Sequence, residues 1–172
     1  MAPSATEGDA HAGTPVTIVI GGLDDPKVRD LLEHHVRTAR EATATGSAHA
    51  LDLEALKSTA VTFWSAWQGA ELVGVGALKS LSSTHGEIKS MHMVHTSRRL
   101  GVGTAMLRHI VAAARTKGMT RLSLETGSWA YFDRARALYR NQGFVECTPF
   151  GDYVEDPNSV FMTLAVELSN PT

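Results

Sequence analysis

The stretch Arg98-Arg99-Leu100-Gly101-Val102-Gly103-Thr104-Ala105 is the most informative part of this chain, because an apolar run ends just before it and a helical pattern begins inside it. Its two glycines lie one residue apart, so no side chain keeps a ligand away from the backbone there. The first turn of the helix leaves its amide N–H groups without partners inside the helix. The helix dipole and the two arginines add positive charge at the same end. The stretch therefore predicts a turn that binds a diphosphate.

A second motif lies downstream, Leu138-Tyr139-Arg140-Asn141-Gln142-Gly143-Phe144. On average residue usage, R-x-x-G-x-G arises by chance in about one chain of this length in ten, and L-Y-x-x-x-G-F in roughly one in a thousand. Together the two motifs resemble those of the GCN5-related N-acetyltransferase superfamily, over residues 15–168. The runs 122–128 and 156–162 are similar to those of a bacterial subgroup, some of whose members are named as indole-acetic-acid-acetylating proteins.

The resemblance implies an acetyltransferase that uses acetyl-CoA as cosubstrate and transfers the acetyl group to a primary amine by direct attack, with no covalent acetyl-enzyme. Main-chain groups of Met93 and Val94 are then expected to meet the pantetheine arm. The diphosphate is expected at Arg98, Arg99, Leu100, Gly101, Val102, Gly103 and Thr104. The chain departs from the family pattern at Phe132, where many relatives carry an asparagine. The alternative is a non-catalytic acyl-CoA-binding sensor or regulatory subunit with the same fold.

Glu87 and Tyr139 are the catalytic candidates. Glu87 stands fourteen residues before Gly101, the spacing at which protein-lysine acetyltransferases of the superfamily carry a glutamate. A half-buried carboxylate can accept the proton of the amine directly or through water. Lys89 shares its side of the strand, and an ion pair between them could lower the pKa of Glu87 and make it a structural residue; a solvated strand carboxylate is the main alternative to the base. Tyr139 falls where relatives place the tyrosine that hydrogen-bonds the sulfur, and donation to the developing thiolate lowers the barrier.

Other residues are candidates for the acceptor site. Glu125 lies near the carboxyl end of a predicted parallel strand, where it could bind the amine or form a salt bridge. His92 and His95 are rival bases, so the base stays open between Glu87, Glu125 and a histidine. The acceptor is further expected to meet the first two helices with their loop, and the segment 150–156, through residues that include Ser47, His49 and Tyr153. An acidic and aromatic loop favours a cationic small molecule or a peptide amine.

The hydrophobic pattern predicts an α/β (α+β) domain over residues 15–168. Strands are expected over residues 16–20, 61–67, 72–81, 87–94, 121–126, 144–147 and 160–166, and helices over residues 25–39, 52–56, 101–117 and 129–141. A helical crossover makes the strands 87–94 and 121–126 parallel. We therefore expect a mixed, mostly antiparallel sheet of about seven strands, with a central parallel pair splayed around the cofactor and helices on both faces.

Composition limits the partners of the chain. Its 172 residues are 43% hydrophobic, with 16 basic and 18 acidic residues and a net charge of −2, so no broad positive field favours nucleic acid or a membrane surface. A single cysteine excludes an internal disulfide, and H-x-x-H without a third ligand does not predict a metal. Residues 1–14 are expected to be a disordered tail without a secretion signal, which favours a cytoplasmic protein. Relatives suggest a possible homodimer.

Overall fold

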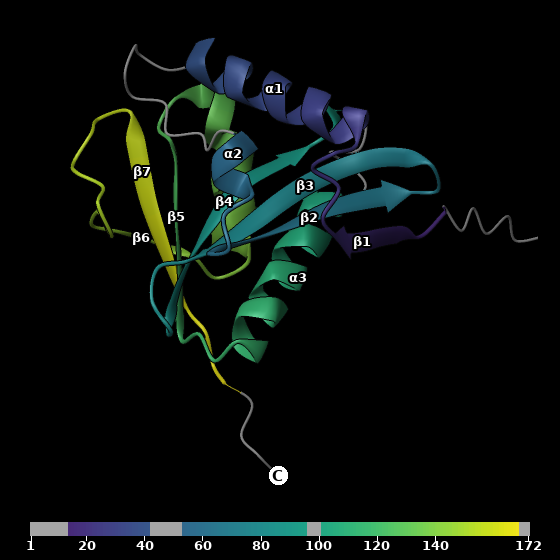
Figure 1. Ribbon diagram of the computed structural model, residues 1–172. Helices are drawn as coiled ribbons and strands as arrows, with labels where there is room; N and C mark the ends of the chain where they lie inside the picture. The colour runs from purple at the N-terminus through teal and green to yellow at the C-terminus, as the bar shows by residue number, and fades with distance from the viewer. Residues whose placement is uncertain (1–13, 42–52, 96–100, 169–172) are drawn as a thin grey trace, which may run out of the picture.

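The computed structural model describes residues 14–41, 53–95 and 101–168, and its centre is a seven-stranded sheet in the order β1-β2-β3-β4-β5-β7-β6 (Figure 1). The strands are β1 (Val16–Ile20), β2 (Val61–Gln68), β3 (Glu71–Ser80), β4 (His85–Met93), β5 (Arg121–Gly127), β6 (Val145–Cys147) and β7 (Ser159–Ala165). Among these strands β4 and β5 pair in parallel and the other neighbours pair antiparallel. The predicted mixed sheet with one parallel pair is confirmed.

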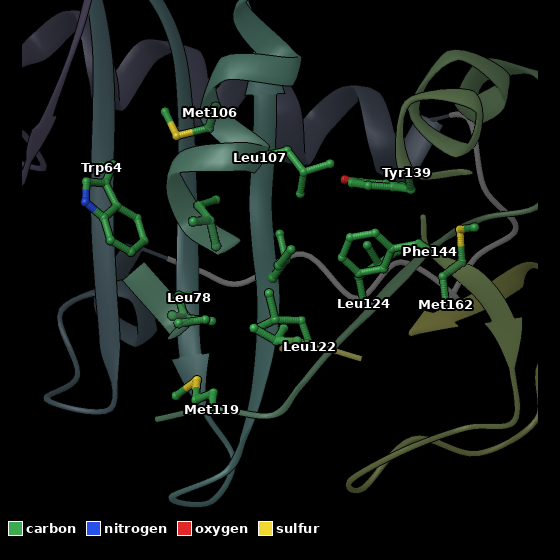
Figure 2. Close-up of a cluster of buried hydrophobic side chains, with 14 of the residues drawn as sticks. Trp64, Leu78, Met106, Leu107, Met119, Leu122, Leu124, Tyr139, Phe144 and Met162 are labelled. Atoms are coloured by element: carbon green, nitrogen blue, oxygen red, sulfur yellow. The ribbon is translucent and has the colours of Figure 1, made fainter. Parts of the chain in front are cut away.

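Helices cover both faces of the sheet, as expected. They are α1 (Pro26–Glu41), α2 (Leu53–Leu56), α3 (Val102–Thr116) and α4 (Asp133–Asn141). Val28 and Leu32 of α1 pack with Leu56 of α2 on one face. Met106 of α3 and Tyr139 of α4 belong to the larger cluster on the other face, where Figure 2 shows Trp64 at one end and Tyr139 with Phe144 at the other. The sheet is thus the middle of three layers.

The helix ends follow the local chemistry of the sequence. Asp25 caps α1, since its Oδ1 accepts the N–H of Lys27 at 2.8 Å, and Pro26 takes the first helical position. Gly118 has a φ of 81° just after α3, and Gly143 has a φ of 95° just after α4. These left-handed conformations suit glycine and turn the chain back toward the sheet.

The predicted helix 129–141 is wrong at its start, because the structure has a short 3₁₀ helix, Ala130–Phe132, before α4. At this break the buried guanidinium of Arg136 donates to the carbonyls of Gly127 and Trp129 and pairs with Asp133. Those carbonyls are therefore held in a turn. The strand predicted over 87–94 begins two residues earlier, and the other strand ends shift by about one residue. The tail expected over residues 1–14 lies outside the described residues except for Thr14.

The central pair of strands separates soon after it forms. The parallel ladder runs only from His85↔Arg121 to Glu87↔Ser123, although both strands continue beyond it. On its other side β4 bulges opposite Gly76, where Ser90 has a φ of 53°. A bulge adds one residue and reverses the alternation of the side chains, so His92 points to the same face as Glu87 and Lys89. The sheet is therefore split from Glu87 onward.

Candidate active site

A cavity of about 300 Å³ lies in the split between β4 and β5. Its walls come from both strands, from the first turn of α3, from α4, and from His35 and Ala39 of α1. Polar groups and main-chain atoms of these elements converge there from parts of the chain that are far apart in sequence. A cavity with this lining at the carboxyl ends of a parallel pair is typical of a ligand site.

The start of α3 opens into this cavity. Gly101 is the N-cap with a φ of 74° and is exposed, and a Cβ there would meet no atom within 4 Å. Gly101, Gly103 and Thr104 all line the cavity. A Cβ on Gly103 would lie 3.1 Å from Leu138 Cδ2, so a larger residue has little room. The geometry suits an anion on the amides of the first turn. Arg98, Arg99 and Leu100 lie outside the described residues.

Met93 is the last residue of β4 and Val94 follows it, and the main-chain groups of these two candidates have different roles. The N–H of Val94 donates to the carbonyl oxygen of Val73 at 2.9 Å, so this amide serves the sheet. Because successive residues of an antiparallel strand direct their main-chain groups to opposite edges, those of Met93 face the split. Met93 also lines the cavity. We therefore expect Met93, and not the amide of Val94, to meet a ligand that enters between the strands.

Tyr139 projects from α4 and lines the cavity while remaining 7% exposed. Its ring packs edge-on against Phe144 with 5.9 Å between centroids. Burial, and then the negative charge of Glu125, raise the pKa of Tyr139 above its usual value. The hydroxyl therefore keeps its proton at neutral pH and can act as a hydrogen-bond donor.

Glu87, Lys89 and Tyr153 form one connected polar group, which we call the Glu87 triad. Glu87 and Lys89 are paired at 3.2 Å with side chains 4% and 11% exposed, which confirms that they share a side of β4 and form an ion pair. The hydroxyl of Tyr153 donates to Glu87 Oε1 at 2.6 Å and accepts from Lys89 Nζ at 3.0 Å. Burial, then the hydrogen bond to Glu87, raise the pKa of Tyr153. The buried carboxylate is thus held by two donors.

Glu125 of β5 lines the same cavity as the two tyrosines. Its charge raises the pKa of both Tyr139 and Tyr153, so its carboxylate is within electrostatic range of both hydroxyls, and it lines the cavity. His92 is buried at the same cavity, with its ring centroid 4.5 Å from that of His35. His95 is exposed. Three of the candidates for the base or the amine site, Glu87, Glu125 and His92, are therefore brought together.

The segment that carries Tyr153 is fixed at both ends. Phe150 packs against Tyr153 and against His85, with centroid distances of 5.1 and 5.9 Å. At the far end, Trp129 Nε1 donates to Asn158 Oδ1 at 2.8 Å. Phe132, which stands where many relatives have asparagine, packs its ring on Gly127, and a Cβ on that glycine would overlap it. An aromatic contact thus occupies the position of the missing polar group.

Two residues expected at the acceptor site lie outside the described residues, and two residues that hold the site were not predicted from the sequence. His49 and Ser47 lie outside the described residues. Arg136 and Asn158 carry no sequence signal that points to their contacts, because both bind main-chain or side-chain groups of loops.

In the described ranges, no group of three or more His, Cys, Asp or Glu side chains could hold a metal ion. No described helix is long and apolar enough to cross a membrane. Burial raises the pKa of the Cys147 thiol, which disfavours a thiolate nucleophile.

Comparisons with known proteins agree with this geometry. The family model described as "Acetyltransferase (GNAT) family" matches residues 28–144. The uncharacterized N-acetyltransferase YsnE of Bacillus subtilis is 50% identical over 146 residues, which cover 85% of this chain and 97% of YsnE. The IAA acetyltransferase of Azospirillum brasilense is 37% identical over 141 residues, covering 81% of this chain and 90% of that protein.

Solved structures share the fold. An acyl-CoA N-acyltransferase from Klebsiella pneumoniae superposes with a TM-score of 0.73 at 25% identity, covering 90% of this chain and all of that one (100%). A GNAT family acetyltransferase from Elizabethkingia anophelis, solved with acetyl-CoA bound, gives a TM-score of 0.64 at 18% identity, covering 87% and 97%. The family model spans most of the chain and the sequence relatives cover nearly all of it, so this chain belongs to the GNAT family of N-acetyltransferases.

Proposed function

We propose that this protein transfers the acetyl group of acetyl-CoA to a primary amine by direct attack. The observation that carries the proposal is a single cavity lined at once by the open start of α3, by Tyr139 and by the two carboxylates Glu87 and Glu125. These are the groups that the reaction needs for the diphosphate, the leaving sulfur and the amine. The acetyl-CoA bound by the Elizabethkingia protein of the same fold supports this choice of donor.

The diphosphate is assigned to the amides of the first turn of α3, with Arg98 and Arg99 as the expected cationic partners. Gly101 and Gly103 let the main chain approach the phosphates, since neither has a side chain over the cavity. The pantetheine arm then enters the split, where the main chain of Met93 faces it. This route leads the thioester toward Tyr139.

The chemistry is assigned to three side chains. Glu125 holds the amine, because a half-buried carboxylate near Tyr139 attracts a cationic acceptor. Glu87 is the final proton acceptor. As the nitrogen of the neutral amine bonds to the carbonyl carbon its two N–H protons become acidic, and a carboxylate can then take one of them. Tyr139 donates a hydrogen bond to the sulfur as the carbon–sulfur bond breaks, and its raised pKa keeps that proton available.

The acceptor is a small or peptide amine that reaches the cavity from the side of α1 and Tyr153. A sensor that only binds acyl-CoA would have no use for the buried Glu87 triad beside the cavity. Burying a charged pair costs several kcal/mol per ion by order of magnitude, which a binding module has no reason to bear. The triad therefore favours the enzyme over the sensor.

The test is amine-dependent release of thiol from acetyl-CoA, with spermidine, lysine, glycinamide and a tripeptide as acceptors. We expect the parent protein to respond to at least one amine, and Tyr139→Phe to lower kcat by roughly ten- to a thousand-fold. Thermal stabilisation by acetyl-CoA should persist in the variant, because the phenylalanine ring keeps the packing against Phe144. Stabilisation by acetyl-CoA without any amine-dependent thiol release would identify the sensor instead.

A further inference from the structure

Glu87 does not face the acceptor with an unoccupied Oε1. That oxygen accepts from the Tyr153 hydroxyl at 2.6 Å and from Lys89 Nζ at 3.2 Å. Glu87, Lys89 and Tyr153 all line the cavity, and the Glu87 side chain is 4% exposed. A proton that travels from the acceptor to this carboxylate oxygen therefore has the Tyr153 hydroxyl in its path.

The place of Tyr153 in the fold supports a chemical role. The residue lies on the connection between β6 and β7, and β5 separates β7 from β4 in the sheet, so the side chain reaches across β5 to Glu87. It meets Glu87 at the last pair of the parallel ladder, where the split begins. Phe150 and Phe161 hold its ring at centroid distances of 5.1 and 5.5 Å. The hydroxyl is thus fixed at the mouth of the split.

We propose that Tyr153 is a catalytic residue that relays the proton of the acceptor amine to Glu87. This inference rests on the proposed function. The acceptor ammonium first loses one proton to solvent, and the neutral amine then forms its bond to the thioester carbon while one of its N–H protons passes to the phenolic oxygen. The phenolic proton passes to Glu87 Oε1 in the same step, so no net charge develops on the tyrosine. Collapse of the tetrahedral intermediate then breaks the carbon–sulfur bond, releases the thiolate toward Tyr139, and leaves Glu87 to return its proton to solvent.

The chemistry of the triad suits this relay. The phenolic oxygen donates to Glu87 and accepts from Lys89, so a proton that arrives at it has a carboxylate to which the phenolic proton can pass. The Lys89 ammonium stabilises negative charge on both oxygens while the protons are in transit. Burial and Glu87 raise the pKa of Tyr153, so the phenol keeps its proton until a new one arrives. Glu125 lines the same cavity as Tyr153 and Tyr139, which suits an amine held at Glu125 with the relay and the sulfur both in reach.

The experiment compares the full-length parent with Tyr153→Phe, Glu87→Gln and the double variant, using acetyl-CoA and the best amine of the panel above. Each single substitution should lower kcat by roughly a hundred- to ten-thousand-fold with the KM for acetyl-CoA unchanged. The double variant should be no slower than the slower single variant, because both substitutions break the same path. Tyr153→His, which can both accept and donate a proton, should recover activity relative to Tyr153→Phe.

Phe161→Leu is the matched control, since it loosens the packing of the same ring from β7 and keeps the hydroxyl. It should raise the KM for the amine and leave kcat within about threefold. If Tyr153 only positioned the loop, Tyr153→Phe would behave like Phe161→Leu and its loss would multiply with that of Glu87→Gln. Multiplying losses would overturn the relay but not the proposed function. The same holds if the parent is active and Tyr153→Phe lowers its kcat by less than about threefold. A parent that acetylates no amine overturns both proposals.

Discussion

The Glu87 triad shows how one residue can satisfy stability and chemistry together. A buried carboxylate without a partner is strongly destabilising, by about 3–5 kcal/mol when one member of a buried pair is removed. Lys89 and Tyr153 meet this requirement by placing two donors on the same oxygen. Substitutions of Glu87 must therefore be read together with a stability measurement, because a loss of activity could otherwise reflect an unpaired buried lysine.

His85 makes stability depend on pH. Burial, and then the positive charge of Arg121, hold the pKa of His85 below its usual value against the opposing effect of Glu87. The unfolded chain then binds a proton at higher pH than the folded protein, so the free energy of unfolding rises with pH. This contribution is present above about pH 6.5 and is lost as the pH falls toward the lower pKa of the folded state.

We therefore predict that the parent loses more stability than His85→Gln between about pH 7.5 and about pH 5.5. Urea midpoints at the two pH values measure the two losses. Glutamine is chosen because it can still bond to Ser123, whose hydroxyl lies 2.7 Å from His85 Nε2. Equal losses in the two proteins would show that His85 does not couple to unfolding.

Among the helices, α3 is packed into the core over part of its length and open to the cavity at its start. Its middle is buried through Met106, Leu107 and Ile110, whereas its first turn opens into the cavity. The two glycines at the start of α3 have different roles. Gly101 ends the incoming segment at positive φ, and Gly103 lets Leu138 of α4 approach.

We predict that Gly103→Leu abolishes thermal stabilisation by acetyl-CoA. The added side chain has only 3.1 Å between its Cβ and Leu138, so it must extend into the cavity where the diphosphate is assigned. The matched control is Ala105→Leu in the same turn, because Ala105 is exposed and the added atoms face solvent. The measurement is the melting temperature of each variant with and without acetyl-CoA. An equal rise in both variants would contradict the assignment of the diphosphate to the first turn of α3.

Gly76 of β3 is another glycine that allows close packing. A Cβ on this residue would lie 3.0 Å from Ile110 and from Met106, so α3 packs directly on the β3 main chain. The β4 bulge lies opposite the same glycine. Close packing and the bulge, both expected for a glycine within a strand, therefore meet at one position and turn His92 toward the cavity.

Across the domain, two clusters of buried side chains lie on opposite faces of the sheet that contains the split. The larger cluster joins α3, α4 and five strands, and α1 with α2 forms the smaller one. The parallel ladder contributes only three paired positions. Beyond Glu87 and Ser123 no ladder pairs join β4 to β5, so packing on the two faces supplies the remaining contacts of these strands with the domain.

We predict that Ile110→Ala lowers the free energy of unfolding by about 2–5 kcal/mol, because this side chain is fully buried between α3 and β3. Val145→Ala is the control, since Val145 is 61% exposed on β6, and it should cost less than about 0.5 kcal/mol. Denaturant unfolding gives both values. A loss below about 1 kcal/mol for Ile110→Ala would mean that the neighbouring side chains of the cluster move into the space left by the removed atoms.

Local patterns predicted most of the elements but not the contacts between them. The seven strands and the stops at Gly118 and Gly143 follow from alternation and from left-handed turns, which depend on neighbouring residues only. The parity of Glu87 and Lys89 likewise put both on one side of the strand and allowed the ion pair that the structure shows. The 3₁₀ turn before α4 was missed because Arg136 binds carbonyls up to nine residues away.

What the sequence determined by itself is the membership of the GNAT family, the order of the elements and the glycine turn at the start of α3, because these reside in short motifs. Only the tertiary structure joined Tyr153 to Glu87 across 66 residues and placed Glu125 within range of two tyrosines. Such contacts depend on which strands separate and by how much, and that is set by packing over the whole sheet.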